Sequence, residues 1–259
     1  MFESAYLKID RAKKHVHDLQ TLLHKYANAA RIEFEPEGRF ITVYVDPKVE
    51  VDSALVIGDA AHNLRSALDH AYWELLGIDT GGKQPKGATL PIHCDGTGES
   101  YEGSIKGIKK ATPSIREDTI KLLTSLEAYG GWDNRLCALH SLDIGDKHKL
   151  LTTVFSITSL RECIVIKPDG TREPWRRLGT FFFNKVDGSA VITPFDKGDR
   201  FDIHSKPQPA LNILFGDIEY LDIQNVMTGF VILEREVRSV LKRMETMLER
   251  RGGTMGQGS

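Results

Sequence analysis

The segment 52–76, DSALVIGDAAHNLRSALDHAYWELL, constrains the fold more than any other part of the chain. Its apolar residues recur at steps of three and four, the spacing that places side chains on one face of an α-helix. The opposite face carries more hydrogen-bonding groups than solubility requires, and these are Asp59, His62, Asn63, Ser66, Asp69, His70 and Trp73. We therefore expect a helix with one face in the core and any function on the other. Asp52 or Ser53 would cap its start, and Gly77 would end it.

Helical spacing of apolar residues recurs elsewhere in the chain. It predicts a long helix over residues 4–30 and another from Asp222 onward, with shorter helices over 113–128 and 133–150. The last long helix carries a continuous apolar stripe and needs partners to cover it. We expect the first helix and the 52–76 helix to be those partners.

Alternating patterns and turn residues predict the strands. Residues 31–45 alternate around a Pro-Glu-Gly sequence, which indicates a two-stranded hairpin. Between residues 151 and 215, short alternating runs separated by turn residues indicate an antiparallel sheet. The glycines and prolines of 81–98 indicate a long loop.

Together these elements predict an α+β fold, a helical bundle that carries an N-terminal β-hairpin and an inserted antiparallel sheet. The chain shows neither an internal repeat nor a segment with the composition of a linker. We therefore expect a single domain over 1–251, with helical parts at 1–150 and 222–251 and the sheet insertion at 151–216. Residues 252–259, GGTMGQGS, would form a flexible tail.

Composition excludes several classes of protein. The 34 Lys and Arg residues nearly balance the 36 Asp and Glu residues, so any site for an anion must be a local patch. Cys94, Cys137 and Cys163 form no CxxC pair, which argues against a zinc knuckle and against a disulfide framework. The N-terminus has no apolar signal region, and no run of eighteen apolar residues occurs. We expect a cytoplasmic protein that does not bind membranes.

Arg65 and His70 are separated by four residues in the sequence RSALDH. This spacing resembles the signature of the HEPN superfamily of helical-bundle ribonucleases, which more often has Asn, Asp or His where this chain has Ser66. The resemblance implies metal-independent RNA cleavage, with His70 taking the proton of the 2′-hydroxyl and Arg65 holding the phosphate. Arg65 and His70 lie about 140° apart on an ideal helix. A distorted helix or a dimer, which the resemblance also implies, would bring them together.

The same residues have a structural interpretation. Asn63, Ser66 and His70 share one stripe of the helix, while Arg65 and Asp69 are spaced for a salt bridge within it. Asn63 and Ser66 are therefore catalytic candidates beside Arg65 and His70, or all four residues hold helices together. The sequence leaves both possibilities open.

A second polar cluster, LHSLDIGDKHKLL, begins at Leu139. Its His140, Asp143 and His148, together with His62 or His70, could bind a metal ion, although Lys147 opposes a cation and suits a phosphate. The pairing of LRSALDH with DKHK is also similar to a family of bacterial and phage-borne proteins for which no activity is established. This resemblance implies that the two clusters lie together. Lys147, His148 and His140 would then bind a phosphate, toward which the basic segment 106–110 could guide a polyanion.

From these patterns we expect a metal-independent endoribonuclease of the toxin or phage-defence type. It would use no cofactor and no metal, bind RNA, form a homodimer and respond to an antitoxin or another protein partner. One alternative is a non-catalytic helical scaffold or sensor that assembles through its C-terminal helix. The other alternative is a metal-dependent hydrolase that uses His140, Asp143, His148 and His70.

Overall fold

The computed structural model describes residues 1–96, 98–130, 134–148, 153–175, 180–184, 187–194, 196–216, 220 and 225–255, without the side chains of 146–148 and 253–255. The chain divides into two compact units. The helical unit comprises Met1–Val16, Gly58–Leu150 and Asp217–Ser259, and the strand unit comprises His17–Ile57 and Leu151–Gly216. The single domain expected over 1–251 stays a prediction.

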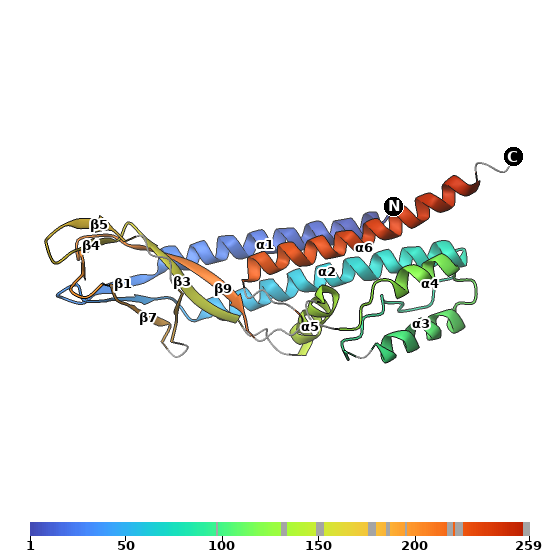
Figure 1. Ribbon diagram of the computed structural model, residues 1–259, viewed down its shortest axis with the longest axis horizontal. Coiled ribbons are helices and arrows are strands. Elements are labelled where there is room, and N and C mark those ends of the chain that lie inside the picture. Colours follow the sequence, from blue (N-terminus) through green and yellow to red (C-terminus); the bar gives the residue numbers. More distant parts are fainter. Residues whose placement is uncertain are drawn as a thin grey trace. The chain divides into compact units, whose positions relative to one another are not determined.

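Within the described ranges, three long helices and three short ones make up the α part of this α+β fold (Figure 1). The long helices are α1 (Glu3–Ala29), α2 (Lys48–Thr80) and α6 (Val226–Met255). The short helices are α3 (Glu99–Ala111), α4 (Glu117–Thr124) and α5 (Arg135–His148). Among the described residues, no helix is both long enough and apolar enough to span a membrane.

The apolar face predicted for the 52–76 segment forms part of the core of the helical unit. Its residues from α2 are 2% exposed or less, and they are Ala60, Ala61, Leu64, Ala67, Leu68, Ala71, Tyr72 and Leu75. The apolar stripe of α6, from Val226 to Leu248, is buried as well. The helical period was therefore a sufficient guide to which faces are buried.

Polar contacts fix the direction in which α6 runs beside its neighbours. Tyr6 of α1 donates to Glu245 of α6 at 3.2 Å, and further along α1 Lys13 lies 4.0 Å from Glu234. Residue numbers therefore increase along α1 in the direction in which they decrease along α6, so the two helices are antiparallel. At its other end α6 contacts α2, since Arg251 donates to Asp79 at 2.8 Å.

Both predicted ends of the 52–76 helix were wrong. The helix begins at Lys48, whose backbone N–H donates to Asp46 at 2.9 Å and is thereby satisfied at the helix start. Asp52 instead accepts a hydrogen bond from Tyr26 at 2.6 Å. At the other end α2 continues past Gly77 to Thr80, and Gly81 takes the left-handed conformation with φ of +61°. The Gly82 N–H then bonds the Gly77 carbonyl at 2.9 Å, as in a Schellman motif.

The short helices differ from expectation more than the long ones. The basic segment 106–110 lies within α3, a helix that was not predicted. The helix expected over 113–128 is confined to α4. At the C-terminus α6 extends to Met255, into the segment expected to be a flexible tail.

The strand unit, as far as it is described, contains three antiparallel sheets of three strands each, in the orders β1-β2-β7, β6-β3-β9 and β5-β4-β8. The strands are β1 (Arg31–Phe34), β2 (Ile41–Tyr44), β3 (Thr153–Arg161), β4 (Ile164–Ile166), β5 (Arg172–Pro174), β6 (Phe181–Phe182), β7 (Ser189–Ile192), β8 (Arg200–Phe201) and β9 (Gln208–Phe215). The predicted hairpin is β1-β2, and its register pairs Ile32 with Val43.

The single inserted sheet that we expected was wrong, because the described strands of 151–216 are divided among three sheets. Strand β7 leaves the other strands of the 151–216 region and pairs with β2 of the N-terminal hairpin. Ile41 pairs with Ile192 and Val43 pairs with Ala190, and all four side chains are buried. The hairpin therefore buries one face through β7, and hairpin and insertion form one compact unit.

Candidate functional site

The guanidinium of Arg65 lies in the interior of the helical unit. Its side chain is 7% exposed, and it donates to Asp69 at 2.7 Å and to the Leu90 carbonyl at 2.8 Å. The same carboxylate oxygen of Asp69 accepts the Leu90 backbone N–H at 2.9 Å. Burial raises the pKa of Asp69, while Arg65 and the Leu90 N–H oppose that change. Arg65 and Asp69 thus tie the 81–98 loop to α2.

His70 has a different set of partners from Arg65. Its Nδ1 lies 3.1 Å from the Ser4 hydroxyl, which donates to Glu74 at 2.9 Å. Glu74 also accepts the Phe2 backbone N–H at 3.1 Å. His70 therefore belongs to a polar cluster at the start of α1, whereas Arg65 faces the loop.

His62, on the polar face of α2, bridges a buried carboxylate and a hydroxyl. Its Nδ1 lies 2.8 Å from Asp143 of α5, and its Nε2 lies 3.4 Å from the hydroxyl of Ser66. The side chain of Asp143 is 5% exposed and that of His62 is 52% exposed. This arrangement orients the imidazole, with the carboxylate at one nitrogen and the hydroxyl at the other.

The sequence predicted Ser66 as a catalytic candidate and His62 only as an alternative to His70 in a metal site with the second polar cluster. The signal was the spacing of four residues between His62 and Ser66, which places them on adjacent turns of one helix face. The sequence related Asp143 to this helix only through the resemblance and as a candidate metal ligand. Its hydrogen-bond distance to His62, 81 positions away, comes from the structure.

The other four predicted site residues are Asn63, His140, Lys147 and His148. Asn63 donates to the Asp59 carbonyl one turn earlier in α2, at 2.7 Å. His140 lies on α5 one turn before Asp143. The side chains of Lys147 and His148 lie outside the described part of the chain. Within the described residues, no group of three or more His, Cys, Asp or Glu side chains is arranged to bind a metal ion.

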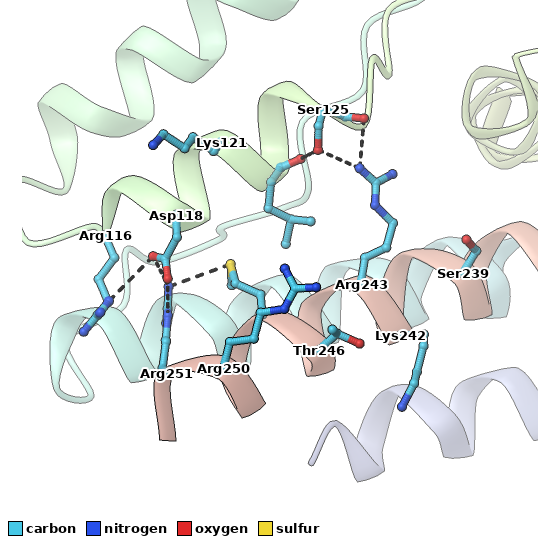
Figure 2. Close-up of a pocket in the computed structure, with 12 residues that line it drawn as sticks. Arg116, Asp118, Lys121, Ser125, Ser239, Lys242, Arg243, Thr246, Arg250 and Arg251 are labelled. Carbon is cyan, nitrogen blue, oxygen red and sulfur yellow. Dashed lines mark hydrogen bonds and ion pairs between the residues drawn. The ribbon is translucent and has the colours of Figure 1, made fainter. Parts of the chain in front are cut away.

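A basic groove of about 900 Å³ lies between α4 and the C-terminal half of α6 (Figure 2). We call it the α4–α6 groove. Its cationic lining residues are Arg116, Lys121, Lys242, Arg243, Arg250 and Arg251, and Asp118 is also part of the lining. Hydroxyl groups of Ser125, Ser239 and Thr246 complete its polar surface. Cations therefore outnumber acidic groups in the groove, although the whole chain is nearly neutral.

Two arginines hold α4 against α6 and shape the groove. Arg251, 9% exposed, donates to Asp79 at 2.8 Å and to both carboxylate oxygens of Asp118, at 2.6 and 2.7 Å. Hydrogen bonds from Arg251 hold the pKa of Asp118 below its usual value. Figure 2 shows Arg243 extending from α6 to Ser125, where it donates to the carbonyl at 3.0 Å and to the hydroxyl at 2.6 Å. Both of these acceptors are uncharged, so these two contacts do not neutralise the positive charge of Arg243, which can attract an anionic ligand.

Two cysteines far apart in the sequence lie together in the helical unit. The Cys94 thiol lies 3.8 Å from the Cys137 carbonyl, and the Cys137 thiol lies 3.5 Å from the His93 carbonyl. The neighbouring Cys94 and burial raise the pKa of the Cys137 thiol far above its ordinary value. These thiols are reduced and help to hold the 81–98 loop on α5.

A scan against family models, a search of curated proteins and a search of solved structures each return no match for this chain.

Proposed function

We propose that this protein binds RNA and that the α4–α6 groove holds the RNA backbone. The observation that carries the proposal is the excess of cationic side chains around this one cavity in an otherwise balanced chain. Arginine and lysine bind phosphates through charge-assisted hydrogen bonds, and a row of such residues follows the regular charge of a nucleic-acid strand.

The spacing of the groove residues on α6 suits an extended ligand. Ser239, Lys242, Thr246 and Arg250 follow one another at three or four positions and form a stripe along the helix. From Ser239 to Arg250 this stripe extends about 16 Å at 1.5 Å per residue. That length exceeds a single phosphate group and favours several phosphates in a row.

The cleavage step is a further part of the proposal and rests on the HEPN resemblance. In that scheme the reaction needs no metal, His70 removes the 2′-hydroxyl proton, and Arg65 stabilises the phosphate. The contacts of Arg65 to Asp69 and Leu90 weigh against a direct role for that residue within one chain. The catalytic roles of Arg65 and His70, the homodimer and an antitoxin partner stay predictions.

RNA binding can be tested by fluorescence anisotropy with a labelled single-stranded RNA over a series of salt concentrations. The variant Lys121→Glu/Lys242→Glu should weaken binding at least tenfold at low salt. It should also reduce the slope of log affinity against log salt by about 0.7 for each phosphate that the variant no longer neutralises. Lys14→Glu/Lys83→Glu, at two exposed positions outside the groove, gives the same change of net charge and is the control. Equal affinities of the groove variant and this control variant would refute the proposal.

Cleavage can be tested separately with labelled oligonucleotides and excess EDTA. Wild-type protein should yield a 2′,3′-cyclic phosphate end, and His70→Ala should not. If RNA binds in the groove but remains intact with wild-type protein, the binding proposal stands and the ribonuclease proposal fails. A DNA strand of the same sequence shows whether binding depends on the ribose.

A second function is favoured by the contacts of Arg65. Polar residues on α2 here fix a loop, as expected of the non-catalytic scaffold. Absence of both RNA binding and cleavage, together with loss of stability when Arg65 is replaced, would support that function.

A further inference from the structure

We propose that Ser66, His62 and Asp143 form a nucleophilic centre that reacts with small activated carboxylic esters. The centre shares no residue with the α4–α6 groove, and the inference does not depend on RNA binding. Its three residues come from two helices, with Ser66 and His62 on α2 and Asp143 on α5.

The geometry follows the order that an activated serine requires. A base must lie within hydrogen-bond reach of the nucleophile, and a third group must orient the base. His62 Nε2 lies 3.4 Å from the Ser66 hydroxyl, and His62 Nδ1 lies 2.8 Å from Asp143. The serine contact is long for an O–H···N bond, as is common in enzymes without bound substrate.

Burial distinguishes the roles of the three side chains. Asp143 is 5% exposed, so its negative charge acts on His62 with little screening by water. It fixes the tautomer with the proton on Nδ1 and leaves Nε2 as the acceptor that faces Ser66. His62 is 52% exposed and Ser66 is half-buried, so an acyl group can reach the hydroxyl from solvent.

The reaction that this arrangement supports is acyl transfer in two steps. The Ser66 oxygen attacks the ester carbon while its proton passes to His62 Nε2, and the alcohol departs with that proton. Water then attacks the acyl-serine, again giving a proton to His62, which returns it to the Ser66 oxygen as the acid is released. The net reaction consumes one ester and one water molecule and yields one acid and one alcohol, with no change of oxidation state. Esters with good leaving groups need the least assistance and are the expected class.

A fluorophosphonate probe tests the reactivity of Ser66 in the intact chain. We expect one label per chain, located at Ser66 by peptide mass spectrometry and absent from Ser66→Ala. His62→Gln should slow labelling about 100-fold, the size of effect expected for loss of a general base. Ser100→Ala, which removes an exposed hydroxyl of α3 outside the centre and outside the groove, should label at the wild-type rate. Circular dichroism establishes that each variant is folded.

Asp143 is a positioning residue, and its role needs a separate measurement. Asp143→Asn should lower the maximal rate of labelling without changing the probe concentration that gives half that rate, and Asp143→Glu should restore part of the rate. Hydrolysis of p-nitrophenyl acetate should follow the same order among the variants. The proposal is overturned if folded wild-type protein is not labelled, if the label is on another residue, or if His62→Gln leaves labelling at Ser66 unchanged.

Discussion

The Arg65 guanidinium and the Leu90 backbone form a closed hydrogen-bonded unit through Asp69. Arg65 donates to the Leu90 carbonyl at 2.8 Å, and the Leu90 N–H donates to the same Asp69 oxygen that accepts from Arg65. Both backbone groups of one loop residue are thus satisfied by a salt bridge on α2. These hydrogen bonds account for the ordered path of the loop around Leu90, where the chain forms neither helix nor strand.

Arg65→Ala should therefore destabilise the protein by about 3 kcal/mol, because it leaves the Leu90 carbonyl without its donor and the Asp69 carboxylate without its cationic partner. Urea unfolding followed by circular dichroism measures this change. Lys106→Ala is the matched control, since Lys106 forms an i,i+4 pair with Glu102 in which both side chains are more than 70% exposed. The control should change stability by less than about 0.5 kcal/mol. Equal costs for the two variants would show that the Arg65 hydrogen bonds add no stability.

Gly38 should tolerate no side chain. Its φ is +72°, and a Cβ there would lie 2.3 Å from the carbonyl oxygen of Phe201 in β8. Gly38→Ala would force β8 away and break the hydrogen bond from the Phe201 N–H to the Gly38 carbonyl. We expect the free energy of unfolding to fall by at least about 2 kcal/mol, from strain and from the broken hydrogen bond together.

Gly170→Ala in the same unit is the control for Gly38. Gly170 also has a positive φ, +87°, but a Cβ there meets no atom within 4 Å. The Gly170→Ala substitution should lower the free energy of unfolding by only about 1 kcal/mol, the conformational penalty of a positive φ. A Gly38→Ala protein as stable as Gly170→Ala would mean that the close approach of Phe201 relaxes without cost.

Local sequence patterns predicted which faces of the long helices are buried. The features that these patterns did not predict depend on residues outside the pattern or on segments far apart in the sequence. The burial of Leu64, Leu68 and Leu75 follows from spacing alone, since periodicity is a property of one segment. The start of α2 depended on Asp46, which lies outside the apolar pattern. The pairing of β7 with β2 joins segments far apart in sequence, and single-strand alternation does not specify a partner.

The candidate sites show the same division. Ser66 was identified because polar residues gather on one helix face, but its connection to Asp143 needs the packing of α5 on α2. The α4–α6 groove left a partial signal in the row of cations that includes Lys242 and Arg250, which the apolar stripe of that helix obscured. Only the docking of α4 turns this row into a cavity.

The ion pair of Asp118 with Arg251 should make stability depend on pH in the acidic range. Hydrogen bonds from Arg251 lower the pKa of Asp118 in the folded protein, so the unfolded chain binds its proton at higher pH than the folded chain. The stabilisation is thus complete above the unfolded pKa near 3.8 and is lost as pH falls through the folded value. Wild type and Asp118→Asn should differ in urea midpoint at about pH 6, and the difference should shrink below about pH 4. A difference that stays constant throughout the acidic range would contradict this account.

Cys163 should resist alkylation as long as the strand unit is folded. Its side chain is buried, and burial raises the pKa of the thiol to about 12, so the reactive thiolate is rare at about pH 8. Iodoacetamide should modify Cys163 at least about 100-fold more slowly in buffer than in concentrated urea, as measured by peptide mass spectrometry. Cys94, which is half-buried, provides an internal comparison and should be modified in buffer before Cys163. If Cys163 instead reacts at the same rate in buffer and in urea, its side chain is accessible in the folded protein and the packing around β4 does not protect it.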